Sequence, residues 1–202
     1  MKRTIAVAGN IGAGKSDLVK FLCRRFGLEP FPEPFDTNPY LADFYRDMKT
    51  FAFRSQVYFL THKFRIHRAI EREPGTVVQD RTIYEDAEIF ARNLWRQRFI
   101  DKRDFATYTE LYETIRAAIA PPDLMIYVKA PVRTLRQRIR KRGRTMEQEI
   151  PASYLRRLNH LYEAWFARYD LSPVETLATD KIDYVTDLVD RLDLLKRIER
   201  YL

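Results

Sequence analysis

The sequence predicts an α/β fold in which a parallel sheet of about five strands is covered by helices on both faces. Short apolar runs rich in β-branched residues alternate along the chain with longer segments whose apolar residues recur every three or four positions. Glycine or proline follows several of these segments and marks their ends. Strands that alternate with helices form parallel sheets, because each return to a parallel neighbour needs a crossover connection.

Five segments have the composition of strands. They are Thr4–Ala8, Leu28–Glu33, Thr76–Asp80, Leu124–Lys129 and Val174–Thr179. The first is a continuous run of small and β-branched residues, which is typical of a strand buried on both faces. The second has the weakest strand character, because Pro30 and Pro32 cannot donate hydrogen bonds to a neighbouring strand.

Eight segments have the apolar spacing of helices. They are Lys15–Phe26, Tyr40–Asp47, Phe51–Glu71, Ile83–Arg98, Asp104–Ile119, Val132–Lys141, Ala152–Tyr169 and Tyr184–Tyr201. In the first of them, Leu18, Val19 and Leu22 follow helical spacing, and Gly27 is a fitting C-terminal stop.

Length and composition fit one globular domain over residues 1–202, with 46% hydrophobic residues. No run of about 18 apolar residues occurs, so we expect no membrane span. The apolar run near the start of the chain is too short for a secretory signal. The single cysteine, Cys23, lies at helical spacing from Val19 and Phe26 and is interpreted as a packing residue. A cytoplasmic location is the default expectation.

The chain is basic, with 36 Lys and Arg against 28 Asp and Glu and a formal net charge of +8. Such a balance favours polyanionic partners. Nucleotides and nucleic acids both meet this description, so charge alone does not decide between them.

A complete phosphate-binding motif follows the first predicted strand. Its eight residues are Gly9, Asn10, Ile11, Gly12, Ala13, Gly14, Lys15 and Ser16, which match G-x-x-x-x-G-K-[ST]. The glycines let backbone N–H groups converge on phosphate oxygens, and the following helix directs its positive end at the same anion. We expect Lys15 to contact the β- and γ-phosphates of ATP and Ser16 to ligate Mg²⁺. The motif indicates use of a nucleoside triphosphate, but motors, GTPases and small-molecule kinases all share it.

Charged residues follow two other predicted strands, and ligands of parallel sheets bind at this edge. Glu33 stands between two prolines, where it is placed either to accept a proton from an attacking hydroxyl or to lie exposed in a turn. Asp80 is a candidate Mg²⁺ ligand. Arg81 is a candidate for neutralising a moving phosphoryl group or for orienting Glu33. An ordinary surface ion pair between Asp80 and Arg81 is the alternative.

The most basic stretch of the chain is Arg133–Arg144. As a helix it places Leu135 and Ile139 inward, and Gly143 ends it, so the arginines on either side of this glycine are expected on a loop. Arginines on a mobile loop can close over a triphosphate, which makes residues 138–150 a candidate lid. A nucleic-acid patch and a solvated basic face are the alternatives.

One face of the predicted helix Phe51–Glu71 carries Gln56, Phe59 and Lys63 at positions i, i+3 and i+7. A polar-aromatic-polar face suits recognition of a heterocycle, but it is more typical of a solvated surface. The neighbouring stripe with Val57, Leu60 and Phe64 is sufficient to explain core packing.

Five segments together resemble the deoxynucleoside kinases, the family that includes deoxycytidine, deoxyguanosine and deoxyadenosine kinases. The segments are GNIGAGKS at 9–16, EPFDTNPYLADFY at 33–45, FRSQVYFL at 53–60, DRTIYED at 80–86 and RIRKRGRTMEQEI at 138–150. They occur in the order and spacing of the family, which is more specific than the phosphate motif alone.

The resemblance implies a P-loop kinase fold with an arginine-rich lid, and transfer of the γ-phosphoryl group of ATP to the 5′-hydroxyl of a deoxynucleoside. It implies that Glu33 is the general base and that Arg81 acts beside it, with Lys15 on the phosphates. It assigns Asp80 to the metal region, although many relatives have Glu-Arg-Ser where this chain has Asp-Arg-Thr.

The resemblance also implies which residues contact the substrates. Gln56 is expected against the base with Phe59, and the sugar 3′-hydroxyl is expected near Tyr45 and Glu147. The expected phosphate contacts of the lid are Arg138, Arg142 and Arg144. The family is usually dimeric, so a homodimer through long helices is expected, with no nucleic acid and no membrane as partner.

An acid at Asp86 and a base at Lys63 are similar to the pattern of relatives that accept purines. The carboxylate accepts from N–H groups of a base, Lys63 donates to a purine acceptor, and Gln56 offers both functions. We therefore expect deoxyadenosine or deoxyguanosine as the acceptor. A nucleoside monophosphate kinase similar to thymidylate kinase and a basic nucleic-acid-binding ATPase are the alternatives.

Overall fold

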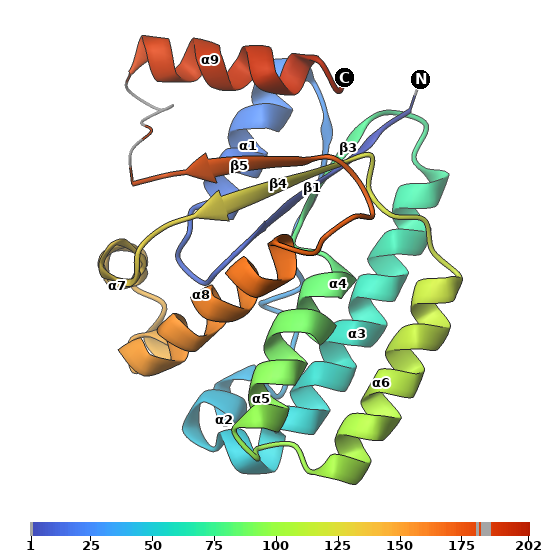
Figure 1. Cartoon of the computed structure of the whole chain (residues 1–202), viewed down its shortest axis with the longest axis vertical. Helices are drawn as coiled ribbons and strands as arrows, with labels where there is room; N and C mark the ends of the chain where they lie inside the picture. Colours follow the sequence, from blue (N-terminus) through green and yellow to red (C-terminus); the bar gives the residue numbers. More distant parts are fainter. Residues whose placement is uncertain (1, 181, 183–186) are drawn as a thin grey trace.

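A parallel sheet lies at the centre of the molecule, and within the residues that the structure describes it has five strands (Figure 1). The computed structural model describes residues 2–180, 182 and 187–202. The strands lie in the order β2-β3-β1-β4-β5, and every neighbouring pair is parallel. Their bounds are Thr4–Gly9 (β1), Glu29–Phe31 (β2), Val77–Asp80 (β3), Leu124–Lys129 (β4) and Val174–Ala178 (β5). The expected parallel five-stranded sheet is confirmed.

Helices cover both faces of the sheet, as predicted. Figure 1 shows α1 and α9 on one side of the sheet, and α3, α4, α5, α6 and α8 on the other. Their bounds are Lys15–Phe26 (α1), Leu41–Arg46 (α2), Met48–Arg72 (α3), Ile83–Glu85 (α4), Arg92–Arg96 (α5), Lys102–Ala117 (α6), Val132–Arg142 (α7), Ala152–Phe166 (α8) and Leu188–Glu199 (α9). A π-helical segment η1 (Asp86–Ala91) joins α4 to α5, and a 3₁₀ turn η2 (Thr145–Glu147) follows α7.

Several predicted helix limits differ from the observed ones for local reasons. Helix α3 begins before Phe51, because the carboxylate of Asp47 accepts a hydrogen bond from the N–H of Thr50 and caps the helix there. The helix predicted over Ile83–Arg98 contains the π-helical segment and ends at Arg96, and Arg98 has the left-handed φ of 61°. The predicted start of the last helix, Tyr184, lies outside the described residues.

The central strand β1 sets the layout of the site. Ile5, Ala6, Val7 and Ala8 are fully buried, and β1 pairs with β3 on one side and β4 on the other. Val7 is paired with Asp80, so the ends of β1 and β3 lie next to one another. The residues that follow these two strands therefore emerge at the same edge of the sheet.

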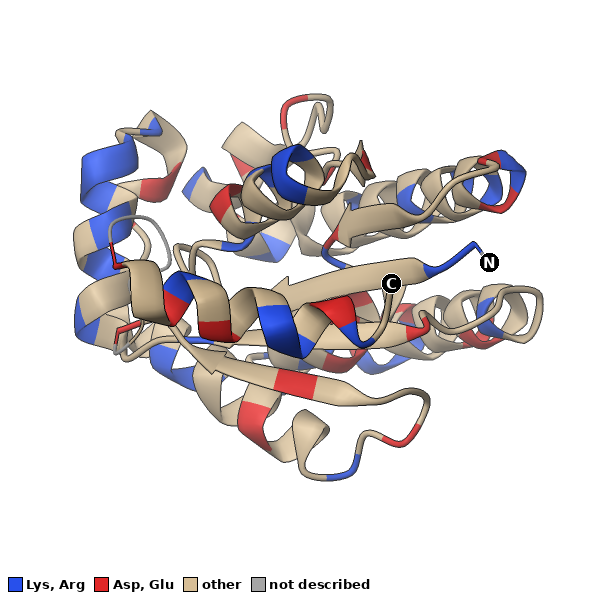
Figure 2. Cartoon of the chain, turned by 90° about the horizontal axis from the view of Figure 1, so that it is seen from above, with Lys and Arg blue, Asp and Glu red and all other residues tan. Residues whose placement is uncertain are grey.

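Basic residues gather near this edge. Helix α7 contributes a dense run of arginines at the left of Figure 2, close to the carboxyl ends of the strands. Its apolar residues Leu135 and Ile139 are buried as predicted. None of the helices in the described part of the chain combines the length and the apolar character that crossing a membrane requires.

Close packing at the end of β1 yields a stability prediction for Gly9→Ala. Gly9 has φ 150°, and an added Cβ would lie 2.4 Å from the carbonyl oxygen of Val128 on β4. Alanine must therefore push the two central strands apart, and we expect a loss of about 2–5 kcal/mol in the free energy of unfolding. Urea denaturation measures it.

The matched control is Gly75→Ala, where an added Cβ would meet no atom within 4 Å. We expect a change of less than about 1 kcal/mol there. Equal losses in the two variants would contradict the packing argument.

Candidate active site

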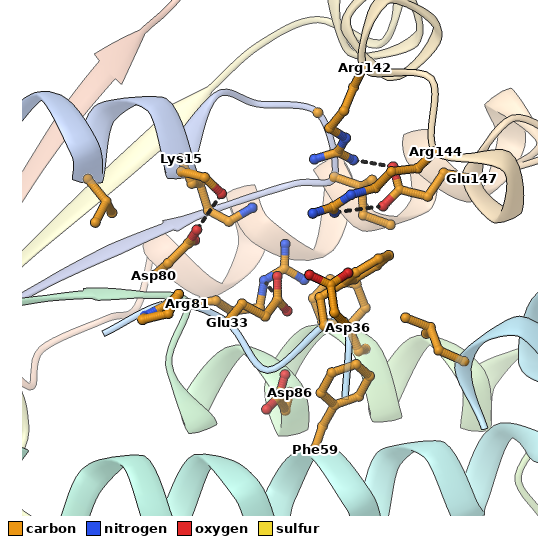
Figure 3. Close-up of a pocket in the computed structure, with 18 of the residues that line it drawn as sticks. Lys15, Glu33, Asp36, Phe59, Asp80, Arg81, Asp86, Arg142, Arg144 and Glu147 are labelled. Carbon is orange, nitrogen blue, oxygen red and sulfur yellow. Dashed lines mark hydrogen bonds and ion pairs between the residues drawn. The ribbon is translucent and has the colours of Figure 1, made fainter. Parts of the chain in front are cut away.

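A cavity of about 400 Å³ opens at the carboxyl edge of the sheet. It collects side chains from the loops after β1, β2 and β3, from α3, and from the segment after α7. Its lining includes most of the predicted site residues, namely Ile11, Gly12, Lys15, Ser16, Glu33, Tyr45, Gln56, Phe59, Asp80, Arg81, Asp86, Arg142, Arg144 and Glu147. Figure 3 shows the labelled members of this set around one space, among them Lys15, Glu33 and Arg144 from different elements.

The phosphate motif forms a tight loop between β1 and α1, the arrangement that an anion-binding loop requires. Gly12 has φ 78°, and a Cβ there would lie 2.8 Å from the carbonyl oxygen of Leu135 on α7. The amide of Asn10 donates to the carbonyl oxygen of Leu155 at 2.9 Å and to Asn159 Oδ1 at 2.6 Å. The loop is therefore held in place by both α7 and α8.

Lys15 is buried at the first turn of α1, and its ammonium group donates to the carbonyl oxygen of Asn10 at 3.2 Å. Burial, together with the neighbouring Arg81 cation, lowers the pKa of Lys15 to about 8. An anion bound at the loop would relieve this cost, because it adds negative charge next to the buried ammonium.

Ser16 at the start of α1 and Asp80 at the end of β3 meet, as their predicted metal role requires. The hydroxyl of Ser16 donates to Asp80 Oδ2 at 2.5 Å, and the buried Oδ1 of Asp80 has no hydrogen-bond partner among the residues that the structure describes. A hydroxyl and a carboxylate with a free oxygen suit Mg²⁺, which binds one or two protein oxygens together with phosphate and water. Nowhere in the described ranges do three or more His, Cys, Asp or Glu side chains cluster as in a metal site built from protein ligands alone.

Glu33 and Arg81 form a pair inside the cavity. Arg81 Nε lies 3.3 Å from Glu33 Oε1, and 21% of the Glu33 side chain remains exposed to the cavity. Burial acts to raise the pKa of Glu33, but the cations Arg81, Lys63, Lys15 and Arg144 outweigh it and lower the pKa to about 2. Glu33 is therefore ionised throughout the physiological range.

The alternative of a surface ion pair between Asp80 and Arg81 is wrong. Both residues are about 4% exposed, and the guanidinium of Arg81 pairs with Glu33 and donates from Nη2 to the carbonyl oxygen of Gly9 at 3.1 Å. The guanidinium also lies over the ring of Phe90, 4.4 Å from its centroid. Arg81 has φ 63°, a strained conformation for a residue with a side chain.

The stripe of Gln56, Phe59 and Lys63 on α3 is buried, so the interpretation as a solvated surface is wrong. All three are at most 8% exposed, whereas Val57 and Phe64 of the presumed core stripe are only partly buried. Hydrophobic periodicity missed this because a site inside the fold places polar side chains on the buried face of a helix.

Lys63 lies just behind the cavity and pairs with Asp86. The Lys63 ammonium is 3.5 Å from Asp86 Oδ2 and donates to the carbonyl oxygen of Arg81 at 3.2 Å. Burial raises the pKa of Asp86 to about 6, although Lys63 acts in the opposite direction. Among the described residues, Asp86 Oδ2 has the ion pair with Lys63 but no hydrogen bond, and the buried Oε1 of Gln56 has no hydrogen-bond partner, so both residues keep acceptor capacity beside the cavity.

The predicted lid residues contact one another above the cavity. Arg142 and Arg144 both pair with the buried carboxylate of Glu147, and the distance from Arg144 Nη1 to Glu147 Oε1 is 3.4 Å. The Arg144 guanidinium also lies 3.9 Å from the ring centroid of Phe35. Arg142 is the last residue of α7 rather than part of a loop, because the helix continues to Gly143, which has φ 74°. Arg144 lies beyond this glycine, as predicted.

Arg138 is the one predicted lid arginine that does not line the cavity. Its guanidinium donates to the carbonyl oxygen of Ala13 and to Thr179, each at 2.8 Å. It therefore fastens the phosphate loop to the residues after β5.

Sequence reasoning missed several residues of the site. Tyr154, Phe35 and Phe90 line the cavity, and no spacing pattern identifies them. It also missed Glu85, which accepts from the backbone N–H of Gly9 at 3.1 Å. The Thr-x-x-Glu spacing of a capping box, present in DRTIYED, was a usable signal for Glu85.

Comparison with known proteins assigns the chain to a group of relatives. The family described as deoxynucleoside kinase matches residues 5–202. A deoxyadenosine/deoxycytidine kinase of Bacillus subtilis is 38% identical over 91% of this chain and 85% of its own length. A deoxyguanosine kinase of Lactobacillus johnsonii is 36% identical, over 96% and 90% respectively. The structure of deoxyadenosine kinase from M. mycoides with bound dATP has a TM-score of 0.85 at 29% identity, covering 98% of this chain and 99% of that one.

The raised pKa of Asp86 predicts a pH-dependent effect of Asp86→Asn on stability. A folded-state pKa of about 6 against an ordinary 3.8 means that the folded state holds the Asp86 proton more tightly. This contribution to stability is complete below pH 3.8 and is lost as the pH rises through 6. On lowering the pH from 7 to 5, the wild type should gain roughly 1–2 kcal/mol relative to Asp86→Asn.

Urea unfolding of both proteins at the two pH values measures this difference. His62 and His67, whose pKa values burial lowers, titrate in the same range with the opposite sign, and their contribution cancels in the difference. The lowered pKa of Glu33 affects stability only below pH 4.5. If the difference in unfolding free energy between the wild type and Asp86→Asn is the same at pH 7 and pH 5, the pKa of Asp86 is not raised.

Proposed function

The chain belongs to the deoxynucleoside kinase family and is an ATP-dependent phosphotransferase, and on this premise we propose that its acceptor is the 5′-hydroxyl of deoxyadenosine or deoxyguanosine. The observation that carries the proposal is the position of Glu33. This ionised carboxylate faces the same cavity as the phosphate loop and is the nearest acid to Arg81.

In the proposed reaction, Glu33 accepts the proton of the 5′-hydroxyl as the oxygen attacks the γ-phosphorus of ATP, and the bond from this phosphorus to the β,γ-bridging oxygen breaks to release ADP. The loop amides and Lys15 hold the phosphates, and Arg81 neutralises charge that develops on the transferred group. The bound triphosphate also alters Glu33, because it engages Lys15 and Arg144, two of the four cations that lower the pKa of this carboxyl. The carboxylate then becomes a better proton acceptor when both substrates are present.

Base recognition is assigned to Gln56 and Asp86. Among the described residues Gln56 Oε1 has no hydrogen-bond partner, and Asp86 Oδ2 has only its ion pair with Lys63, so the two acceptors suit N–H groups of a purine edge. Lys63 keeps Asp86 ionised near neutral pH and thus able to accept. Phe59, from the same helix face as Gln56, supplies an apolar surface for the ring.

The sugar and the phosphates are assigned to the opposite side of the cavity. Tyr45 and Glu147 lie there and suit contacts with the 3′-hydroxyl, because a carboxylate accepts from a hydroxyl donor. Arg142 and Arg144 suit closure over the phosphates. Arg138 has a different proposed role, since its contacts hold the phosphate loop rather than reach into the cavity.

Ser16 and Asp80 are the proposed protein ligands of Mg²⁺, directly or through water. The metal would neutralise charge on the β- and γ-phosphates when bound. The free Oδ1 of Asp80 supports this assignment.

Membership of the family favours this function over the two alternatives. A monophosphate kinase needs extra cations for the phosphate of its acceptor, whereas the acidic Glu33 beside the acceptor position would repel that phosphate. On α7, the contacts of Arg138 with the phosphate loop and of Arg142 with Glu147 support roles in the kinase site.

We also propose that the protein forms a homodimer and is located in the cytoplasm. Trp95 at the end of α5 is 40% exposed and stacks on Phe105 at 4.6 Å, which supports a contact surface on the long helices. Sedimentation at micromolar concentration tests the dimer.

The base role predicts the effect of Glu33→Gln. The amide cannot accept the hydroxyl proton, so kcat should fall by about 10²–10⁴-fold while both substrates still bind. Steady-state kinetics and calorimetric titration measure the two effects. Glu29→Gln, an exposed change at the start of β2, should leave kcat unchanged. Turnover of Glu33→Gln at the wild-type rate would remove Glu33 from this role.

The acceptor assignment predicts that kcat/KM for deoxyadenosine or deoxyguanosine exceeds the values for deoxycytidine and thymidine. Asp86→Asn should lower the purine value by about 10- to 100-fold, because one acceptor site becomes an amide donor. The rate of ADP release with ATP and each of the four deoxynucleosides measures the acceptor preference of the wild type and the effect of Asp86→Asn. Asp43→Asn on the exposed face of α2 serves as the control. Higher efficiency with either pyrimidine would overturn the purine assignment.

A further inference from the structure

Glu85 is a fully buried carboxylate outside the cavity lining. Its Oε1 accepts from the backbone N–H of Gly9 at 3.1 Å and from the hydroxyl of Tyr162 at 2.8 Å. Its Oε2 accepts from the backbone N–H of Thr82 at 2.8 Å and from the Thr82 hydroxyl at 3.3 Å. Both oxygens are therefore occupied by donors from three separate parts of the chain.

These contacts converge on Gly9, the first residue of the phosphate loop. Its N–H donates to Glu85, while its carbonyl oxygen accepts from Arg81 Nη2 at 3.1 Å and lies 2.9 Å from the hydroxyl of Tyr162. Both backbone polar groups of Gly9 are thus fixed by side chains. A backbone held on both sides cannot shift along the strand without breaking several buried hydrogen bonds.

The same carboxylate also fixes the acceptor side of the site. Glu85 holds the backbone N–H of Thr82, the residue directly after Arg81. Arg81 has a φ of 63°, and this strained backbone requires support from its surroundings. Glu85 also immediately precedes Asp86, the first residue of the π-helical segment. The Glu85 side chain therefore connects the phosphate loop, Arg81 and the segment that carries Asp86.

We propose that Glu85, assisted by Tyr162, is a positioning residue that sets the distance between the phosphate loop and the Arg81–Glu33 pair. The inference rests on the proposed function of that pair. Glu85 touches neither substrate in this account and acts through Gly9 and Arg81. Its effect is on the alignment of the two reacting groups rather than on the strength with which either substrate binds.

A carboxylate is the side chain that this position requires. All its neighbours are donors, and a carboxylate has acceptor sites on both oxygens. Glutamine has the same shape, but its NH₂ group must face either the N–H of Gly9 or the N–H of Thr82. One buried donor then loses its partner, and the backbone at that donor must move.

The test is the steady-state kinetics of Glu85→Gln with ATP and the best deoxynucleoside acceptor. Because misplacement of about 1 Å can cost 10²-fold in rate, we expect kcat to fall by about 10- to 100-fold with both KM values within about threefold of wild type. Tyr162→Phe, which removes one of four donors, should lower kcat by about three- to tenfold. In the double variant kcat should fall less than the product of the two single effects, because both act through Gly9.

Tyr127→Phe is the matched control. Tyr127 lies on β4 with its ring 5.8 Å from that of Tyr162, and its hydroxyl donates to Glu163 at 3.0 Å, away from the loop. The Tyr127→Phe protein should have a lower melting temperature than the wild type but the same kcat. Thermal unfolding of all variants identifies any that do not fold, in which case Tyr162→Phe carries the test.

Unchanged kcat in folded Glu85→Gln and Tyr162→Phe proteins, with only a lower melting temperature, would overturn the proposal and leave Glu85 as a structural residue. Raised KM with unchanged kcat would overturn it equally. The wild-type rate tests the proposed function separately, because a wild-type enzyme without deoxynucleoside kinase activity would contradict that function before any variant is compared.

Discussion

The guanidinium of Arg81 connects the two halves of the active site. It pairs with Glu33 on the acceptor side and donates to the carbonyl oxygen of Gly9 on the donor side. The register of β1 against β3 makes both contacts possible, because it brings the ends of the two strands together. The strained backbone of Arg81 is held by hydrogen bonds from the Lys63 ammonium and to the carbonyl oxygen of Val7. The proposed chemistry therefore depends on a single charged side chain fixed by its surroundings.

Two carboxyl groups in the same cavity have pKa values shifted in opposite directions. Four cations lower the pKa of Glu33 to about 2, whereas burial raises that of Asp86 to about 6. Divergent environments of this kind commonly separate the roles of paired acids in enzymes. Here they distinguish a carboxylate that is always available as an acceptor of protons from one whose charge depends on Lys63. The cations that surround Glu33 are also those that a triphosphate would engage.

Local sequence patterns predicted the sheet, its parallel direction and the position of most site residues, because each strand ends in a recognisable charged or glycine-rich segment. They failed where tertiary packing decides. Gln56 and Lys63 were indistinguishable from a solvated face, since only the fold shows that α3 turns this stripe toward the cavity. Arg138 shares its helix with Arg142, yet contacts with Ala13 and Thr179 direct Arg138 elsewhere. Tyr162 acts on Gly9 from a distant part of the chain, and no spacing rule relates the two.

The most direct test of the account is a crystal structure with a purine deoxynucleoside and a non-hydrolysable ATP analogue. The account predicts that a carboxylate oxygen of Glu33 lies at about 2.6–3.2 Å from the 5′-hydroxyl oxygen, with that oxygen in line with the γ-phosphorus. A nucleoside bound with its 5′-hydroxyl beyond the reach of Glu33, and nearer to another acid, would contradict it.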